Sequence, residues 1–432
     1  MFFSLSRFLD SKFAKNLSLK EISDLKLLTR IFPFKVSRYV LEELIDWNNK
    51  KSDPIYRLTF PQHEMLTDHS WDLLKSAKSA EEQKQVINQI RRLLNPHPDG
   101  QKDNIPKIGN RTFGGIQHKY KETVLFFPSQ GQTCHSFCTY CFRWAQFVNL
   151  DEHKFRSKDH ADLFDYLNQK KEVTDILFTG GDPLFMSNAI LFKYLDVLMK
   201  PQLNHIRNIR IGSKALAFYP HRFLGDEGDK LLNKLRSIRR SGKNIALMAH
   251  ISHPVELSTS KVQEAIRRLR NHGVIIRSQA PLIKGINDDA EIWRTMWNDS
   301  VSLGIVPYYM FVERDTGAHH YFSIPLYKAY QIFTEAFSKI TGLAKTVRGP
   351  SMSAKPGKVL IVGIIGRGDD KKFVLKFIQA RNPLLVNKPF FAKFSPNATW
   401  LDELEIESPM NEMIMDGATY FEEDDLSIDE VA

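Results

Sequence analysis

The sequence predicts an α/β fold whose mostly parallel sheet forms either an open doubly wound sheet or a closed or partial (β/α) barrel. The first observation is a series of six short apolar segments bounded by turn residues, as buried parallel strands tend to be. The second is the amphipathic helical patterns between them. In a barrel, the chemistry is expected at the carboxyl ends of the strands. The predicted strands are 123–127, 174–179, 208–212, 244–250, 273–278 and 305–311.

The helical patterns have the spacing of surface helices that pack on a sheet. Residues 262–269 place apolar side chains at i, i+3, i+4 and i+7, and residues 231–238 do nearly the same. Both patterns end at a glycine, which is a common stop signal for a helix. Nearer the N-terminus, residues 36–47 are predicted to be the clearest helix.

Changes in composition and in the pattern of apolar residues along the chain predict four regions. Residues 1–115 form a mainly helical N-terminal region, and residues 116–350 form the barrel. Residues 351–400 form a C-terminal extension that includes a further β-rich run at 359–365. Residues 401–432 hold 12 acidic residues and no Lys or Arg, which predicts a solvated acidic tail.

The charge outside the tail is strongly basic. Residues 1–400 hold all 60 Lys and Arg and the other 38 acidic residues, a formal charge of +22. Such a body attracts nucleic acid, a membrane surface or anionic small molecules, and net charge alone does not choose among them. No apolar run approaches the length of a membrane helix, and no secretory signal is evident, so a cytoplasmic protein without a membrane partner is expected.

The three cysteines of the chain all lie in one short window. Cys134, Cys138 and Cys141 have spacings of four and three, directly after the first predicted strand. Three thiolates can hold three corners of a [4Fe–4S] cluster and leave the fourth iron open to bind something else. A closed zinc site with His135 is the main competitor, but zinc sites usually pair two short knuckles and only one is present.

A glycine-rich turn follows the next predicted strand. Gly180 and Gly181 allow a ligand to approach the backbone closely, and Asp182 can accept hydrogen bonds from an ammonium or hydroxyl group. Taken alone, this pattern is most often just a turn. Its position one strand and helix after the cysteines makes it a candidate part of the same site.

The cysteine pattern, with Tyr140 before the last cysteine, resembles the signature of the radical S-adenosylmethionine (SAM) superfamily. Within it, the chain resembles the lysine 2,3-aminomutase family in the order and spacing of many short motifs. That resemblance implies a partial (β/α) barrel of the radical SAM type, in which the open iron binds SAM and one electron cleaves it to a 5′-deoxyadenosyl radical. The matching segments are 53–57, 118–120, 134–143, 180–184, 209–212, 250–254, 284–289 and 307–309.

The resemblance also implies roles for individual residues. The turn at Gly180 to Asp182 corresponds to the stretch that meets the amino group of SAM, and His253 and Gln279 correspond to further contacts with SAM. Arg143 lies where the family binds the substrate carboxylate, and a planar guanidinium suits that task. A flavodoxin or ferredoxin as reductant and a homo-oligomer are also expected, and nucleic acid is not expected as a partner.

Members of this family also bind pyridoxal phosphate (PLP), and the resemblance places Lys355 at the Schiff-base position. The glycines of that stretch are replaced here, although Ser351 and Ser353 can donate hydrogen bonds to a phosphate. Lys355 precedes a proline, which restricts it to extended conformations, and Lys358 is the alternative.

The substrate ammonium of lysine is held in this family by two carboxylates. Asp288 matches one of them, but the other position is Arg348. An arginine facing an ammonium 4 Å away costs about 4 kcal/mol at an effective dielectric of 20, so free lysine is not the expected substrate. Two other roles remain open, a structural Asp288–Arg348 pair and an Arg348 that receives a substrate carboxylate or phosphate.

The sequence therefore predicts a radical SAM enzyme that carries out PLP-assisted 1,2-amino migration on an amino acid other than free lysine. The first alternative is a PLP-independent radical SAM enzyme that acts on another small molecule, a peptide or a nucleic acid. The second is a zinc-stabilised nucleic-acid-binding protein. Iron and sulfide in anaerobically purified protein would support either enzyme, and stoichiometric zinc would support the binding protein.

Overall fold

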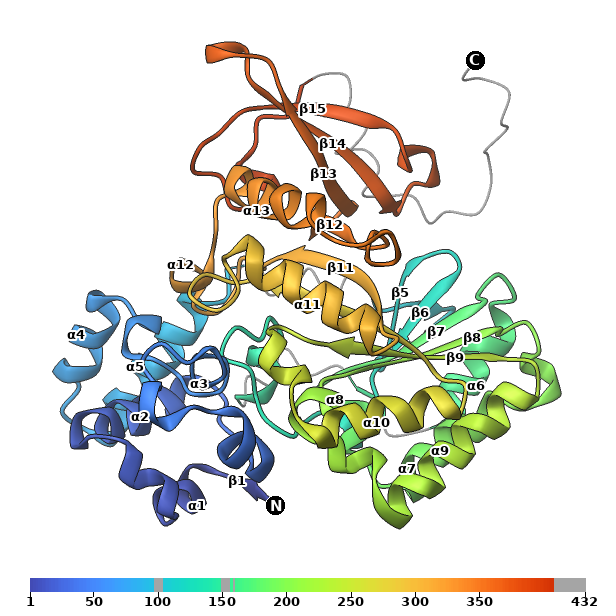
Figure 1. Cartoon of the computed structure of the whole chain (residues 1–432), viewed down its shortest axis with the longest axis horizontal. Coiled ribbons are helices and arrows are strands. Elements are labelled where there is room, and N and C mark those ends of the chain that lie inside the picture. The colour runs from blue at the N-terminus through green and yellow to red at the C-terminus, as the bar shows by residue number, and fades with distance from the viewer. Residues whose placement is uncertain (97–103, 149–155, 158–159, 408–432) are drawn as a thin grey trace.

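The computed structural model describes residues 1–96, 104–148, 156–157 and 160–407. Figure 1 shows three parts: a helical N-terminal part, a central sheet with helices along it, and a C-terminal part built mainly from strands β13 to β15. Among the described residues, no helix has the length and apolar character needed to cross a membrane. Residues 401–407 of the predicted acidic tail are described, and Leu401 and Leu404 are buried in the C-terminal core, so the tail is not solvated from residue 401 as expected. Residues 408–432 lie outside the described residues.

One sheet of eleven strands runs through the central and C-terminal parts. From β6 to β12 every neighbouring pair is parallel, and β5 pairs antiparallel with β6 at one edge. All six predicted strands are present, which confirms the α/β class. The strands are β5 (Ile116–Tyr120), β6 (Thr123–Phe126), β7 (Asp175–Phe178), β8 (Asn208–Ser213), β9 (Asn244–His250), β10 (Ile275–Leu282), β11 (Val306–Val312) and β12 (Arg348–Ser353).

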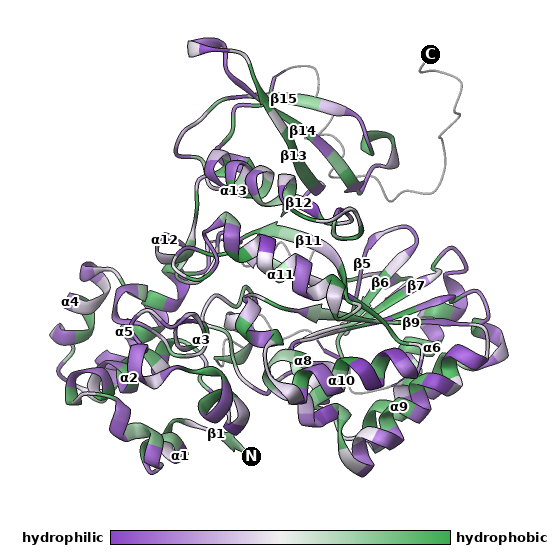
Figure 2. Ribbon diagram, in the orientation of Figure 1, coloured by the Kyte–Doolittle hydropathy of each residue, from purple (hydrophilic) through white to green (hydrophobic). Residues whose placement is uncertain are grey.

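Helices cover one face of this sheet and leave the other face to the barrel interior (Figure 1). In α10 the four apolar residues at the predicted spacing are all buried, and the side chain of Thr259 caps the amino end of the helix. Figure 2 shows hydrophilic and hydrophobic residues mixed along α9 and α10, as expected for helices with one buried face. The helices are α6 (His160–Gln169), α7 (Asn188–Val197), α8 (Ala215–Phe218), α9 (Gly225–Arg240), α10 (Ser260–Asn271), α11 (Ala290–Ser302), α12 (His319–Phe322) and α13 (Leu326–Ser338).

The sheet curls into a partial barrel. Lys119 lies in β5, and its Nζ donates a hydrogen bond of 2.5 Å to the carbonyl of Ala354, directly after β12. These strands stand at opposite ends of the parallel portion of the sheet, so they can meet only if the sheet curves round. Side chains, and not a pair of strands, bridge the gap. The partial barrel expected from the sequence is confirmed.

The N-terminal part is mainly helical, but the helix predicted at 36–47 is only partly formed, over residues 38–44. Val36 and Ser37 form strand β2, which pairs antiparallel with β1 (Phe2–Phe3), because the backbone of the first residues supplies hydrogen-bond partners that a local pattern does not reveal. A single π-helical turn, Val40–Leu44, follows it. The regular helices are α1 (Leu5–Leu9), α2 (Leu19–Ile31), α3 (Pro54–Thr59), α4 (Asp68–Ser76) and α5 (Ala80–Leu93); a short hairpin, β3 (Lys107–Ile108) and β4 (Arg111–Thr112), precedes the barrel.

The C-terminal part continues the sheet with antiparallel strands. The expected run at 359–365 lies in β13 (Gly357–Ile365), followed by β14 (Lys372–Ala380) and β15 (Pro389–Lys393). Alternate residues of β14 are buried in a separate apolar core, which makes this lysine-rich segment a half-buried strand. The boundary expected between 350 and 351 falls inside β12, so this part has no linker at that point.

Candidate active site

The three cysteine thiols lie close together in the loop after β6. Burial raises the pKa of each thiol, that of Cys138 to about 12, and neighbouring thiolates raise the pKa of Cys134 further. Each thiol also has a cation near it that favours the thiolate. These cations are Lys35 for Cys134, Lys214 for Cys138 and Arg143 for Cys141.

The donor set fits an iron–sulfur cluster better than a zinc ion. Among the described residues, no group of three or more His, Cys, Asp or Glu side chains converges as the ligands of a single ion would. His135, the expected fourth zinc ligand, stacks on Tyr219 with ring centroids 4.9 Å apart, and its Nδ1 lies 3.5 Å from Asp182. A cluster needs only three thiolates, and each of them binds a different iron atom, which spaces the thiolates more widely.

The N-terminal part holds the backbone of the cysteine loop. The amide of Phe137 donates to the carbonyl of Lys35 at 2.9 Å, and the amide of Ser37 donates to the hydroxyl of Ser136 at 2.9 Å. Thr139 donates twice to the end of α3, through its amide to Leu58 at 2.9 Å and through its hydroxyl to Arg57 at 2.7 Å. The N-terminal region is therefore part of the site and not an appendage.

The glycine turn packs directly on the entrance of the cysteine loop. A Cβ at Gly181 would lie 2.4 Å from the backbone N and O of Thr133, and Gly180 has a φ of +136°. The amide of Asp182 donates to the carbonyl of Thr133 at 2.7 Å. The two motifs are thus locked together, and this contact explains why the positions are glycines.

Asp182 is buried and its carboxylate is used inside the chain. It accepts hydrogen bonds from the hydroxyl of Ser213 at 2.7 and 2.9 Å and from the amides of Leu184 and Lys214 at 2.9 and 3.0 Å. These bonds join the ends of β7 and β8. In this structure Asp182 shapes the turn, and Gly180 and Gly181 pack on Gln132 and Thr133 just before the first cysteine.

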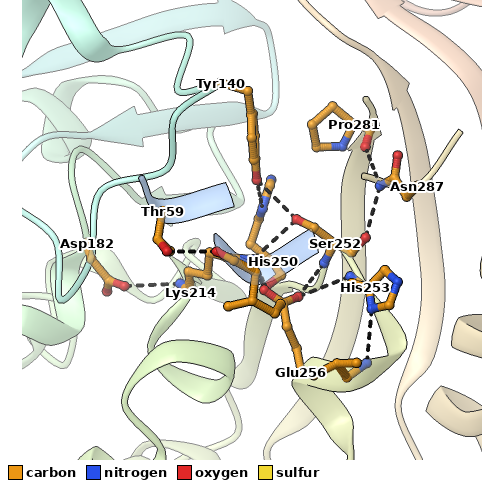
Figure 3. Close-up of polar contacts among 12 residues, drawn as sticks. Thr59, Tyr140, Asp182, Lys214, His250, Ser252, His253, Glu256, Pro281 and Asn287 are labelled. Atoms are coloured by element: carbon orange, nitrogen blue, oxygen red, sulfur yellow. Dashed lines mark hydrogen bonds and ion pairs between the residues drawn. The ribbon is translucent and has the colours of Figure 1, made fainter. Parts of the chain in front are cut away.

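A polar network joins the ends of β8 and β9 beneath the cysteine loop (Figure 3). Lys214 pairs with Glu256 at 2.6 Å and donates to the hydroxyl of Ser252 at 3.2 Å. The hydroxyl of Tyr140 lies 3.1 Å from both that hydroxyl and Nδ1 of His250. Burial, and then Lys214, lowers the pKa of His250 to about 3, so its ring is neutral at physiological pH.

Of the two residues expected to contact SAM, His253 follows the end of β9, and Gln279 lies within β10, level with the last residue of β9. His253 caps a short helical turn, because its Nδ1 accepts from the amide of Val255 at 3.3 Å, and burial lowers its pKa. Gln279 pairs in register with His250 and is half-buried at a bulge in β10. The structure therefore brings both residues to the same end of the barrel as the cysteine loop.

Arg143 is buried beside the cysteines, where the resemblance places a substrate carboxylate. Its guanidinium carbon lies 4.4 Å from the centre of the Phe127 ring. Burial lowers the pKa of Arg143 to about 9, and Arg314 contributes to the lowering while the cysteine thiolates oppose it. Both guanidinium groups also lie over the Phe142 ring, at 5.2 Å for Arg143 and 5.5 Å for Arg314, so two cations lie next to the cysteines.

Further cations lie near β11 to β13, where Lys358 and Lys119 are half-buried and Arg348 is exposed. Nζ of Lys358 lies 4.2 Å from the centre of the Tyr309 ring, and burial lowers its pKa to about 7, with Arg210 and Arg348 adding to the effect. Nη1 of Arg348 donates to the hydroxyl of Tyr309 at 3.2 Å. Burial likewise lowers the pKa of Lys119 to about 7.

The remaining predicted residues do not all meet at this site. Lys355 is exposed in the turn between β12 and β13, and the structure does not bring it to the interior. Asp288 is exposed in the loop after β10, and it forms no ion pair with Arg348 among the described contacts. Ser351 is fully buried and Ser353 half-buried, both on the strand that precedes Lys355.

Sequence reasoning missed the roles of Lys214 and Glu256. Lys214 follows a predicted strand directly, and a cation at the carboxyl end of a barrel strand was a usable signal. Glu256 gave no such signal, because its partners come from another strand end and from the backbone of Ser252, which donates to it at 2.5 Å.

Comparison with known proteins gives a clear set of relatives. The chain is 30% identical over 400 residues to a provisionally named L-lysine 2,3-aminomutase of Aquifex aeolicus (strain VF5), covering 92% of this chain and 95% of that protein. It is 26% identical to a glutamate 2,3-aminomutase of Clostridioides difficile (strain 630), covering 76% of this chain and 67% of that protein.

Solved structures give weaker similarities. A radical SAM methyltransferase from Sphaerobacter thermophilus has 14% identity and a TM-score of 0.37, covering 55% of this chain and 68% of that chain, which is too low to establish a shared fold. No family model matches the chain.

Proposed function

Because the chain belongs to the lysine 2,3-aminomutase family of radical SAM enzymes, we propose that it moves an amino group from Cα to Cβ of an amino acid other than free lysine, with PLP as a second cofactor. The proposal rests mainly on one observation: cations near the cysteine loop and the interior lysines near β13 lie close enough to interact. The guanidinium groups of Arg143 and Arg314 both lie over the Phe142 ring, at 5.2 and 5.5 Å, and Arg314 and Lys358 both lower the pKa of Lys119. These contacts support a proposal in which the cluster ligands and the interior lysine serve one space.

The residues of the cysteine end have distinct tasks in this proposal. Cys134, Cys138 and Cys141 hold the cluster, and the backbone of Gly180 and Gly181, with His253 and Gln279, contacts SAM. When bound, the cluster and SAM supply a 5′-deoxyadenosyl radical. The buried rings and the network below the loop exclude water from that space, which protects a reactive intermediate.

The substrate end is built for negative charge. Arg143 binds the substrate carboxylate, and Arg348 lies over the rings of Tyr308 and Tyr309 at 5.2 and 5.6 Å, where a lysine ammonium would be repelled. A relative named for glutamate indicates that the family accommodates more than one side chain. A flavodoxin or ferredoxin is the proposed electron donor.

One observation favours a second candidate, a PLP-independent radical SAM enzyme on another small molecule. The lysine that aligns with the family's PLP lysine, Lys355, is exposed at the surface. An enzyme that has lost PLP has no need of a lysine in the interior at that position.

The test is an anaerobic assay of the reconstituted protein with SAM, dithionite and a panel of amino acids, with and without PLP. The aminomutase proposal expects a β-amino acid that forms only when PLP is present. If 5′-deoxyadenosine is produced without any β-amino acid, with or without PLP, the result supports the second candidate instead. As controls, single Cys→Ala variants at the three ligand positions should each lose SAM cleavage, because each removes one corner of the cluster.

A further inference from the structure

We propose that Lys358, and not Lys355, is the lysine that binds PLP covalently. This inference rests on the proposed function and identifies the residue that anchors its second cofactor. It departs from the resemblance of the chain to its family, which places Lys355 at that position.

The strand register places Lys358 on the inner face of the sheet. Lys358 of β13 lies directly opposite Ser353 of β12, so the two side chains share one face. On that face Nζ of Lys358 lies 4.2 Å from the centre of the Tyr309 ring and 5.5 Å from that of Phe311. Both rings belong to β11, so the amine lies over strands of the barrel and not over the C-terminal core.

Lys355 has the opposite placement. It lies in the turn after β12, its side chain is exposed, and its carbonyl accepts a hydrogen bond of 3.1 Å from Nε of Arg381. That bond fixes the backbone of the turn. Bringing the Lys355 side chain inside would require the turn to give up this contact and the one from Lys119 to Ala354.

The surroundings of Lys358 favour a neutral amine, which is the nucleophilic form. Burial, together with repulsion from Arg210 and Arg348, lowers its pKa to about 7. Among the described contacts no carboxylate pairs with Lys358 to restore the charge. A lysine desolvated beside other cations is a typical activated amine.

Two hydroxyl groups on the same face can hold the phosphate. Ser351 and Ser353 alternate along β12, so they point to the side that Lys358 occupies. The hydroxyl of Ser351 is fully buried and has no hydrogen-bond partner within the described chain. A buried hydroxyl without a partner is costly, and a phosphate oxygen would satisfy it.

The covalent step is a simple condensation without a change of oxidation state. The lone pair of the Lys358 amine attacks the aldehyde carbon of PLP, a C=N bond replaces the C=O bond, and the oxygen leaves as water with two protons from the amine. An incoming amino acid can displace the lysine by the same exchange, which returns Lys358 as a free amine.

Lys119 is the natural control for this assignment. Burial also lowers its pKa to about 7, so it matches Lys358 in protonation. Its Nζ, however, already donates to the carbonyl of Ala354 at 2.5 Å. If the protonation state alone decided which lysine reacts, PLP would label both lysines. If binding of the phosphate beside the amine is also needed, PLP would label only Lys358.

The experiment treats the full-length protein with PLP at pH 7.5, reduces it with borohydride and maps the modified peptides. We expect the Lys358 peptide to carry at least about tenfold more label than any other lysine peptide, because surface lysines are mostly charged at this pH and the Nζ of Lys119 already donates to the carbonyl of Ala354. The Lys355→Arg and Lys119→Arg variants should keep that label, and the Lys358→Arg variant should lose it. Circular dichroism verifies that each variant is folded. If a variant is not folded, the peptide map of the labelled wild-type protein still decides which lysine binds PLP.

The outcomes separate this inference from the function on which it rests. A main label on Lys355 or Lys119, or equal labelling of many lysines, overturns the assignment to Lys358. If β-amino acid still forms in that case, the proposed function stands and only the residue is wrong. If no lysine is labelled and SAM is still cleaved without β-amino acid, both fail.

Discussion

Gly181 shows how closely the two cofactor-binding motifs depend on each other. Its Cα packs on the backbone of Thr133, one residue before the first cysteine, and leaves no space for a side chain. The sequence predicted a glycine turn near the cysteines but not this contact, because nothing in a linear pattern shows which loops will touch.

A Gly181→Ala variant should therefore displace the cysteine loop. The added Cβ would meet backbone atoms at 2.4 Å, and such overpacking typically costs about 1–3 kcal/mol. We expect reduced iron and sulfide content after reconstitution and a lower melting temperature. Gly212→Ala is the matched control, since a Cβ there has its nearest neighbour at 3.5 Å. Equal cluster content in wild type and Gly181→Ala would show that the contact is unimportant.

Arg348 should act on substrate choice. In the Arg348→Asp variant a carboxylate replaces the cation beside Tyr309, and each recovered charge-assisted contact with a lysine ammonium contributes about 1.5–3 kcal/mol. We expect the KM for lysine to fall about tenfold or more. Arg277→Asp is the control, because Arg277 also lies over Tyr308 but belongs to β10. Efficient turnover of lysine by the unmodified protein would contradict this prediction.

At the scale of whole elements, the barrel strands were predictable and several other strands were not. Buried parallel strands such as β9 are short apolar runs that a local pattern reveals. In contrast, β14 alternates lysines with buried Phe373, Leu375 and Phe377, so its composition suggested a basic surface segment. Strand β12 was not among the predicted strands, because its serines and Pro350 are more typical of turns than of strands; its parallel pairing with β11 decides its structure.

The hydrogen bonds between α3 of the N-terminal part and the cysteine loop give a second prediction about whole elements. Thr139→Val keeps the shape of the side chain but removes the hydroxyl that donates to Arg57. Loss of that buried bond should cost about 1–2 kcal/mol and loosen the loop from α3. We expect a lower melting temperature and faster loss of iron to a chelator. Thr139→Ser keeps the hydroxyl and should restore both values. A Thr139→Val protein that retained its iron like wild type would show that this clamp is dispensable.

For the molecule as a whole, the interior lysines predict a distinct pH dependence of stability. The folded-state pKa values of Lys119 and Lys358 lie near 7, below the value of 10.5 for an unperturbed lysine. Between these values the unfolded chain binds more protons than the folded protein, so the contribution of both groups to stability rises with pH above about 7. Below pH 7 both states are protonated and the slope vanishes.

This dependence is measured by urea unfolding of the cofactor-free protein at pH 7, 8 and 9. The free energy of unfolding of the Lys358→Met variant should rise less steeply with pH than that of wild type. Lys355→Met is the control and should leave the slope unchanged, since Lys355 is exposed. Parallel slopes for wild type and Lys358→Met would mean that Lys358 is solvated and charged in the folded protein.

The proposed migration of the amino group is tested most directly by an isotope label that follows the nitrogen itself. Reconstituted protein with SAM, PLP and dithionite is given an amino acid, selected from the panel, that carries ¹⁵N on its α-nitrogen, and the product is analysed by NMR. Migration of the amino group predicts that the ¹⁵N is bonded to Cβ in the product and that SAM is not consumed in proportion to product. Product whose ¹⁵N remains on Cα, or stoichiometric loss of SAM without a β-amino acid, would contradict it.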